Sequence, residues 1–366
     1  MDNTLQQAVL AAVTDVLNDH QENGTLANLS VVQLQDLAAL FQESGFFNLL
    51  LPEERGGAEL NLQQCLAVLL QEGVYALPIA LASTNLANAW LHAQGLDLAM
   101  GAVAIESACA AAGLNGSAAE NSTQSNSVAQ DGANGHESSK KGLISIGIKA
   151  QSFTHLTPQI LLAVADKAYL LETTHYLTDS VDSDHSALWL NLNLEHAKAL
   201  EVNAEAVQKL HDLAVLSSIA VSQGAMRQLL EMTVKYAAER TQFGRKLSQF
   251  QAIQQQLSVM AECVCSAQMA AELAYYSDST IPNKNHLILA KHQMSLVANQ
   301  VANIAHAVHG AIGITKEYPL HFYTQIIRQN RSRGGSEMYW AEQLGAAVLQ
   351  SDKTVLEILS EDLLVS

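Results

Sequence analysis

The sequence predicts a mainly α-helical protein in which a small β-rich domain separates two helical ones. Three observations predict it: helix-like spacing of apolar residues up to about residue 98, short strand-like runs in the middle, and long helical periodicity from about residue 204. We therefore expect an N-terminal helical domain at 1–98, a middle β-rich domain at 99–203 and a C-terminal domain at 204–366. Four long helices are expected in the last of these, enough for a four-helix bundle.

The N-terminal segment has the pattern of amphipathic helices. Apolar side chains recur at three- and four-residue intervals at Leu5, Val9, Ala12, Val13, Val16 and Leu17. Further helices are expected near 31–43, 61–73 and 81–94. An apolar run at 45–60 contains a loop marked by proline and glycine, P-E-E-R-G-G, from Pro52 to Gly57.

The middle segment combines a polar stretch with candidate strands. Residues 115–142 are rich in Asn, Ser, Gly and Gln, so they cannot bury enough apolar surface to offset their ordering entropy. We expect a flexible surface insertion there. Strand-like runs follow at 143–150, 159–165, 168–177 and 187–194. The last run alternates Leu188, Leu190, Leu192 and Leu194 on one face, as a half-buried strand does.

The C-terminal segment predicts helices over 206–238, from about Leu247, through Leu287 to Val308, and over 337–361. Arg240, Arg245 and Lys246 cluster around a turn at Gly244, between the first two helices. Such a cluster suits a phosphate or pyrophosphate. A solvated corner between helices would also account for it.

The charge, the cysteines and the histidines of the sequence argue against several classes of protein. A net charge of −17 and a pI near 5.1 argue against a nucleic-acid binder. The four cysteines show no disulfide framework and are expected as buried free thiols, and the thirteen histidines lack metal-ligand spacing. The N-terminus has no basic signal-peptide region, and no run of 18 apolar residues occurs. We expect a cytoplasmic protein without a membrane span or a metal.

Three motifs carry a resemblance to a known family. R-T-Q-F-G-R-K-L-S-Q-F-Q, from Arg240 to Gln251, resembles the R-x-x-F-G-x-x-L-x-x-x-Q motif of acyl-CoA dehydrogenases. The loop from Pro52 to Gly57 and the glycine turn H-G-A-I-G-I-T-K-E-Y-P-L, from His309 to Leu320, resemble two further family segments in the same order. The matching regions cover about two-thirds of the chain. Helical domain, β domain and four-helix domain is also that family's architecture.

The resemblance implies FAD and an acyl-CoA substrate, with α,β-desaturation of the thioester as the reaction. It also implies a dimer or tetramer, homomeric or with a related subunit, because FAD lies across a subunit interface in the family. An electron-transfer flavoprotein is the usual electron acceptor. Neither the acyl chain length nor the choice between a steroid and a fatty acyl group follows from the sequence.

The resemblance also assigns roles to residues. Arg240 would meet the FAD diphosphate, with Phe243, Leu247 and Gln251 lining the adenosine end. Gly310 and Gly313 would let the backbone approach the same cofactor. A purely structural turn role is the alternative for each residue. The glutamine that the family often places before the glycine turn is Ala307 here, which weakens the adenosine site.

The catalytic base is missing from both positions that the family uses. One lies 24 residues after the first glycine of the turn, at Gly334, and the other 26 residues before the motif arginine, at Ala214. Ser336 can still donate a hydrogen bond to flavin. Glu337 is expected as a first-turn residue of a helix that Ser336 caps, with a displaced base as the alternative.

The middle domain departs from the family as well. Of the 101 residues from 100 to 200, 28 form the polar insertion, and the remaining 73 are few for the family's β domain. Three hypotheses follow: a subunit that takes its base from a partner chain, a self-sufficient dehydrogenase with a displaced base, or a scaffold that has lost flavin.

Overall fold

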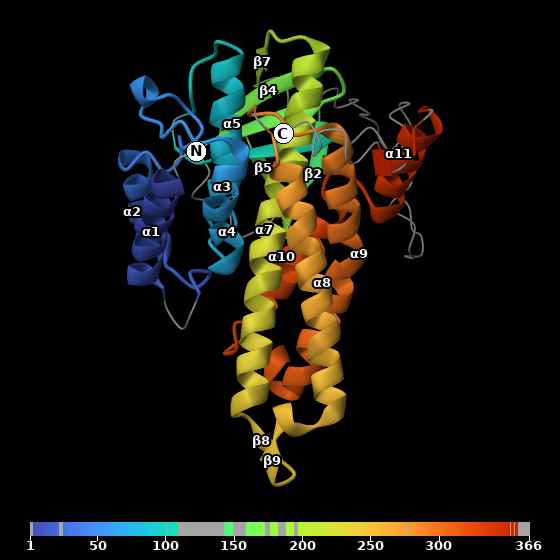
Figure 1. Ribbon diagram of the computed structural model, residues 1–366. Coiled ribbons are helices and arrows are strands. Elements are labelled where there is room, and N and C mark those ends of the chain that lie inside the picture. Colours follow the sequence, from blue (N-terminus) through green and yellow to red (C-terminus); the bar gives the residue numbers. More distant parts are fainter. Residues whose placement is uncertain are drawn as a thin grey trace, which may run out of the picture.

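The computed structural model describes residues 3–21, 25–99, 101–108, 143–148, 159–172, 176–181, 188–193, 197–277, 279–351, 353–354 and 356–357. Helices at the N-terminus, small sheets in the middle and long helices at the C-terminus follow one another, which confirms the predicted fold class (Figure 1). The predicted insertion at 115–142 lies outside the described residues. The division into these three domains stays a prediction.

The N-terminal part of the chain consists of helices, two of which are capped by polar side chains. They are α1 (Asn3–His20), α2 (Val31–Glu43), the 3₁₀ turn η1 (Glu53–Arg55), α3 (Leu62–Leu69), α4 (Gln71–Val74) and α5 (Leu81–Ala93). Capping boxes begin α2 at Ser30 and α3 at Asn61, where a glutamine three residues later bonds back to the cap. The predicted helices are confirmed, although the one expected at 61–73 is divided into α3 and α4.

Two small sheets form the middle of the chain. One has the order β1-β3-β4-β7, from β1 (Val103–Ala108), β3 (Gln159–Val164), β4 (Lys167–Glu172) and β7 (Lys198–Leu200). β1 and β3 are parallel, with Val103 opposite Gln159, and the other pairs are antiparallel. The second sheet has the antiparallel order β2-β6-β5, from β2 (Leu143–Ile148), β6 (Leu188–Asn193) and β5 (Tyr176–Val181). The predicted runs are strands, the third divided between β4 and β5, whereas β1 and β7 were not predicted.

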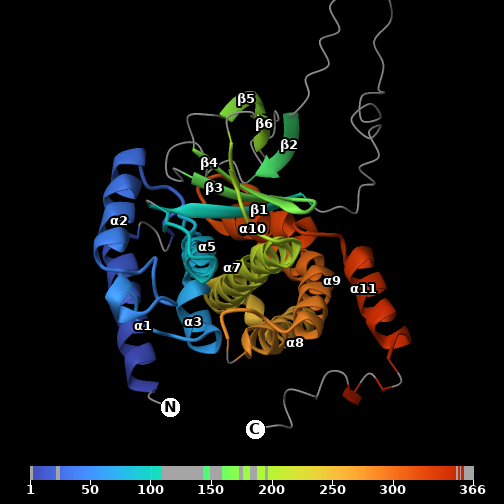
Figure 2. The same cartoon turned by 90° about the horizontal axis from the view of Figure 1, so that it is seen from above.

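The C-terminal bundle consists of α7 (Ala204–Glu239), α8 (Gln251–Tyr275), α9 (Lys284–His309) and α10 (Leu320–Ser332), seen end-on in Figure 2. α11 (Glu337–Leu349) packs outside this group, on α9. The prediction of 337–361 as the fourth bundle helix is therefore wrong in place and length. α10 takes that position because its apolar face, which includes Leu320, Tyr323 and Ile327, is buried against α7 and α9.

The second bundle helix begins later than predicted. Leu247–Gln249 form a 3₁₀ turn, so α8 starts at Gln251 and not at Leu247. Of the described helices, α8 is the one long and apolar enough by composition to cross a membrane. It packs against α7 and α9 with a buried face that includes Met260, Val264 and Ala267.

One continuous hydrophobic core joins all three parts of the chain. α4 crosses α7 with backbone against backbone at two glycines. A Cβ atom added to Gly224 would lie 1.9 Å from the carbonyl oxygen of Leu70, and one added to Gly73 would lie 2.0 Å from that of Val221. This crossing fixes the N-terminal helices on the bundle.

Candidate functional site

The candidate residues lie at two well-separated places along α7. Ala214, near its start, is 26 residues from Arg240, the residue that caps its end. At about 1.5 Å per helical residue this is a rise of about 39 Å. We call residues 240–251 together with 309–320 the hairpin end, and residues 331–337 the corner segment.

The hairpin end is built on a two-residue β turn. β8 (Thr241–Gln242) pairs with β9 (Arg245–Lys246) around Phe243 and Gly244, whose φ angles are 54° and 79°. Two successive positive φ angles are typical of a type I′ turn, where glycine costs nothing and phenylalanine is strained. The amide of Leu247 donates to the carbonyl oxygen of Arg240 at 2.9 Å and closes the hairpin.

Phe243 is 89% exposed although it is a large apolar residue, and its ring meets that of Phe250 edge-on at 6.2 Å. Gln251, another predicted contact of the cofactor, is the exposed first residue of α8. An apolar side chain held in a strained and exposed position suits a contact with another molecule.

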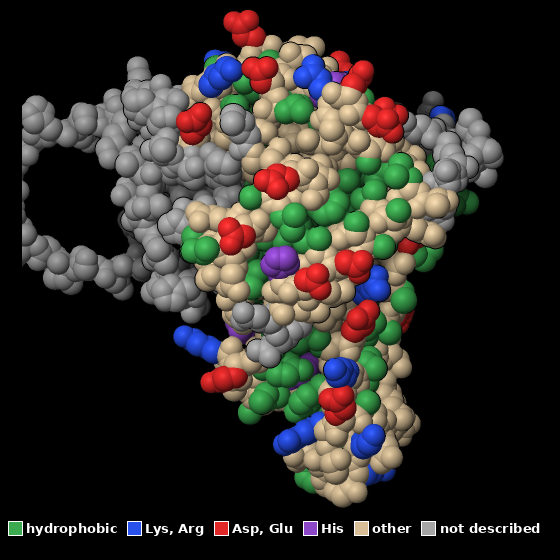
Figure 3. All heavy atoms as spheres, turned by 90° about the vertical axis from the view of Figure 1, so that its left-hand side faces the viewer, with side chains coloured by type: hydrophobic (Ala, Val, Ile, Leu, Met, Phe, Trp, Pro, Cys, Tyr) green, Lys and Arg blue, Asp and Glu red, His purple; other side chains and the backbone are tan. Residues whose placement is uncertain are grey.

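Cations gather at the same end. Arg240, Arg245 and Lys246 are exposed, and none of them forms a salt bridge within the part of the chain that the structure describes. The Arg245 guanidinium lies 4.0 Å above the Phe250 ring. Figure 3 shows Lys and Arg side chains at the lower end of the molecule, where Figure 1 places β8 and β9. Unneutralised cations in an acidic protein can bind a phosphate group.

The glycine turn lies beside the hairpin. Gly310 ends α9 with φ 62° and ψ −138°, and a Cβ atom there would meet nothing within 4 Å. At Gly313 a Cβ atom would lie 2.9 Å from His309 Cβ and from Leu320 Cδ2. The backbone at Gly310 is therefore accessible to a ligand. At Gly313 a larger side chain would clash with His309 and Leu320, which accounts for the glycine there.

The two empty base positions meet in space. Gly334 has φ 74°, and a Cβ atom on it would lie 2.6 Å from Cγ2 of Val215, the neighbour of Ala214. A Cβ atom on Gly335, where φ is 131°, would lie 2.4 Å from the Tyr339 ring. Trp340 packs beside both glycines, and its buried indole N–H has no partner among the described residues. This space is filled by the chain's own side chains.

Ser336 and Glu337 begin α11 as predicted. The Ser336 hydroxyl accepts a hydrogen bond from the amide of Tyr339 at 3.2 Å, which makes Ser336 the N-cap. The Glu337 carboxylate lies 2.7 Å from the Arg331 guanidinium, with both side chains partly exposed. A carboxylate that is ion-paired at a helix start is in a structural position. Asp212 is engaged too, in an ion pair with Lys284.

An ion pair between a partly exposed arginine and a buried glutamate connects the corner segment to the first sheet. The Arg333 guanidinium lies 2.5 Å from the Glu106 carboxylate of β1 and 3.1 Å from the carbonyl oxygen of Ile105. Burial raises the pKa of Glu106, and the Arg333 charge opposes that shift. The ion pair therefore connects the end of α10 to strand β1 at the residue before Gly334.

Lys291 holds the corner segment from the other side. This α9 residue is 1% exposed, and its ammonium group donates to the carbonyl oxygen of Asn330, near the end of α10, and to the Ser218 hydroxyl. Ser295, one turn later, donates to the carbonyl oxygen of Arg331 at 2.8 Å. Burial, and then the Arg333 charge, lower the pKa of Lys291 to about 7. Both residues satisfy free carbonyl groups at the end of α10.

The stability of the protein should depend on pH through Lys291. Its folded-state pKa of about 7 lies below the unfolded value of 10.5, so the cost of burying the charge is full below pH 7 and fades as the pH rises towards 10.5. We expect the free energy of unfolding, relative to that of Lys291→Met, to rise by about 1 kcal/mol per pH unit above pH 7. Urea unfolding at pH 7 to 9 measures it. Lys235→Met, which removes an exposed lysine, should keep the wild-type slope; equal slopes in Lys291→Met and wild type would contradict the assignment.

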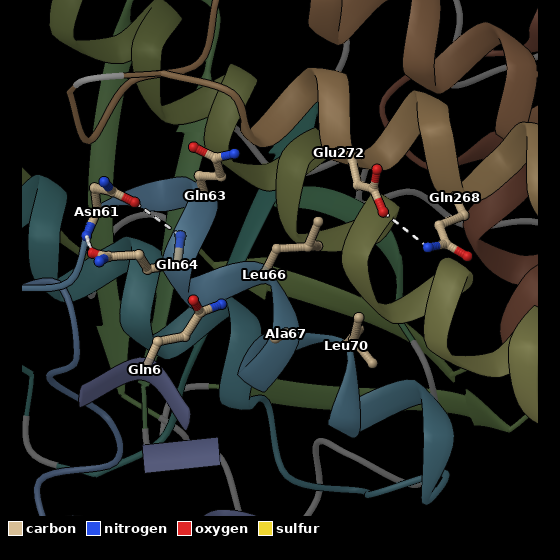
Figure 4. A pocket seen from close by; sticks show the side chains of 9 residues that line it. All are labelled: Gln6, Asn61, Gln63, Gln64, Leu66, Ala67, Leu70, Gln268 and Glu272. Atoms are coloured by element: carbon tan, nitrogen blue, oxygen red, sulfur yellow. Dashed lines mark hydrogen bonds between the residues drawn. The ribbon is translucent and has the colours of Figure 1, made fainter. Parts of the chain in front are cut away.

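A separate cleft of about 580 Å³ lies between the N-terminal helices and α8 (Figure 4). Its lining residues are Gln6, Asn61, Gln63, Gln64, Leu66, Ala67, Leu70, Gln268 and Glu272. Amides dominate this set, and Gln268 donates to Glu272 at 2.9 Å. The lining contains no cation, so the cleft does not suit the phosphates of a coenzyme.

Glu106, Arg333 and Lys291 were not predicted from the sequence. The one signal is Glu106 itself, a charged residue directly after the apolar run A-V-A-I. Two of the four cysteines, Cys65 and Cys263, are buried free thiols as predicted, whereas Cys265 is exposed and Cys109 lies outside the described residues. The described residues contain no group of three or more His, Cys, Asp or Glu placed to hold a metal ion.

Residues 206–349 match the family model described as acyl-CoA dehydrogenase, C-terminal domain. Over 131 residues the chain is 30% identical to an acryloyl-CoA reductase (NADH) of Anaerotignum propionicum. The aligned region covers 36% of this chain and 32% of the relative. It is also 31% identical over 116 residues to the acyl-CoA dehydrogenase IpdE2 of Mycolicibacterium smegmatis, and this region covers 32% of this chain and 36% of the relative. The sequence similarity thus spans about a third of the length of these relatives.

The fold is similar over nearly the whole chain. The ChsE4-ChsE5 complex from Mycobacterium tuberculosis matches with a TM-score of 0.69 at 17% identity, over 96% of this chain and 100% of that one. Butyryl-CoA dehydrogenase from Megasphaera elsdenii matches with a TM-score of 0.63 at 17% identity, over 94% and 98%. Residues 206–349 are thus similar in sequence to the C-terminal domain of acyl-CoA dehydrogenases, and almost the whole chain is similar in fold to these structures.

Proposed function

We propose that the chain is a subunit of an FAD-dependent acyl-CoA dehydrogenase that takes its catalytic base from a partner chain. The observation that carries the proposal is the separation of the two ends: about 39 Å of helix lie between Arg240 and Ala214, more than one extended FAD molecule spans. One cofactor bound at the hairpin end therefore cannot reach the corner segment of the same chain. A complete site needs two chains.

The residues present fit FAD at the hairpin end only. Exposed cations and the open backbone at Gly310 suit a diphosphate, with Arg240 as the principal contact and Phe243, Leu247 and Gln251 towards the adenosine. At the corner segment, Val215, Tyr339 and the Glu106–Arg333 pair occupy the space around the two glycines, which leaves Ser336 without an evident route to flavin. When bound, FAD supplies the hydride acceptor for α,β-desaturation. Glu337 is ion-paired with Arg331, so the catalytic base is assigned to the partner chain.

The comparisons support a two-chain assembly by analogy. One of the similar structures is a complex of two named chains, ChsE4 and ChsE5. We propose a related subunit with an intact glutamate as the partner, an acyl-CoA as the substrate and an electron-transfer flavoprotein as the acceptor. A cytoplasmic location is part of this proposal.

Replacing Arg240 by glutamine tests the proposal at the residue that it depends on most. Loss of a charged hydrogen bond to phosphate costs about 1.5–3 kcal/mol, so we expect FAD affinity of the assembled protein to fall about 10- to 100-fold. Equilibrium dialysis measures it. Arg227→Gln is the control, because Arg227 lies on the same helix but pairs with Glu231 at 3.2 Å. Unchanged FAD affinity in Arg240→Gln would refute the assignment.

A further inference from the structure

Three aromatic side chains join the end of α7 to the glycine turn. The Tyr236 ring stacks on the His309 ring with centroids 4.5 Å apart and planes at 26°. The Tyr236 hydroxyl donates to the carbonyl oxygen of His309 at 3.4 Å, and Tyr318 meets Tyr236 edge-on at 6.2 Å. α7 and α9 are thereby connected at the hairpin end through both a ring contact and a hydrogen bond.

The His309 ring is fixed in one orientation. It is 3% exposed, and its Nδ1 lies 2.8 Å from the carbonyl oxygen of Ala305, a pure acceptor, so Nδ1 carries the proton. Nε2 is then the acceptor for the Tyr318 hydroxyl at 3.1 Å. Burial, together with the nearby His306, lowers the pKa of His309, which agrees with a neutral ring.

The stack lies directly beside the two groups assigned to the cofactor. Tyr236 is one helical turn before Arg240, and His309 is the residue before Gly310. Arg240 is on the hairpin and Gly310 on the glycine turn, so nothing in the local sequence sets their separation. The stack does, because each ring is attached to one of the two segments.

We infer that Tyr236 and His309 are positioning residues for the diphosphate of the cofactor. They touch no phosphate themselves; they hold the Arg240 side chain and the Gly310 backbone at the separation that lets one diphosphate meet both. The inference rests on the proposed function. It adds that the ring contact, and not only the motif residues, determines affinity for the adenosine diphosphate half of FAD.

Calorimetric titration of the full chain with ADP tests the inference. Tyr236→Leu removes the stack and should weaken ADP binding at least tenfold, whereas Tyr236→Phe keeps the stack and should bind within about threefold of wild type. Tyr275→Leu is the control: like the half-buried Tyr236, the fully buried Tyr275 donates to a backbone oxygen, that of Leu216 at 3.0 Å, but near the other end of α7. It should lower thermal stability and leave ADP affinity unchanged.

The outcomes separate the two claims. ADP binding that Tyr236→Leu leaves intact would overturn the inference alone, and so would a Tyr275→Leu variant that loses as much affinity, since affinity would then follow stability. A wild-type chain that does not bind ADP would overturn the assignment of the hairpin end to FAD, and the positioning role with it.

Discussion

Replacing Gly224 by alanine is expected to lower the free energy of unfolding by about 3–5 kcal/mol, because the new Cβ meets backbone that cannot move aside. That atom would lie 1.9 Å from the Leu70 carbonyl oxygen and 2.9 Å from the Val74 nitrogen. Relief requires α4 to separate from α7, which opens the core between the N-terminal helices and the bundle. Urea unfolding of the purified chain measures the loss.

Gly345→Ala is the control for that substitution. Gly345 lies inside α11, and a Cβ atom on it would meet nothing within 4 Å. Removing a glycine from an open helix position should raise the stability by about 0.5–1 kcal/mol. Two glycine-to-alanine changes of opposite sign would show that the α4–α7 crossing, and not helix propensity, determines the first effect. A Gly224→Ala variant as stable as wild type would contradict the close approach.

Replacing Arg333 by methionine is expected to cost about 3–5 kcal/mol at pH 7, because it leaves the Glu106 carboxylate buried without its cation. The pKa of Glu106 should then rise further above its unfolded value of 4.5. Because the pKa of Glu106 is higher in the folded than in the unfolded protein, ionisation of Glu106 destabilises the fold at high pH. This destabilisation disappears at a pH where Glu106 is protonated in both the folded and the unfolded protein. The loss should therefore shrink as the pH falls towards 4.5.

Two further variants check the cause of that loss. Glu106→Gln combined with Arg333→Met should recover part of the stability, since the buried charge is gone. Arg331→Met breaks a partly exposed pair with Glu337 in the same segment and should cost no more than about 1 kcal/mol. Losses of equal size in Arg331→Met and Arg333→Met would contradict a buried pair at Glu106. Thermal unfolding from pH 4.5 to 7 provides the comparison.

The fold could be predicted because its helices carry their apolar faces in the sequence. The start of α11 was predicted at its residue because Ser336 and Glu337 are local signals that need no tertiary contact. The sequence does not predict α10, and it predicts the helix at 337 as the fourth member of the bundle. Which of two amphipathic helices enters a bundle depends on the turn between them, and the Arg333–Ser336 turn directs α11 outward onto α9.

The candidate site could be predicted only where a motif is contiguous. Gly334 and Ala214 were found by separate offsets along the chain, and the contact of Gly334 with Val215 brings the two positions together. Glu106 and Lys291 were not found, because each acts on the corner segment from a distant element, β1 in one case and α9 in the other. Such contacts depend on tertiary packing, which no spacing rule encodes.

The visible absorption spectrum of the chain purified alone, with FAD added, tests most directly whether it lacks a base of its own. We expect that an acyl-CoA does not bleach the flavin bands until a related subunit with an intact glutamate is present. Bleaching in the isolated chain would contradict the account, because it would show that this chain supplies its own base. Glu337→Gln would then be the first variant to examine.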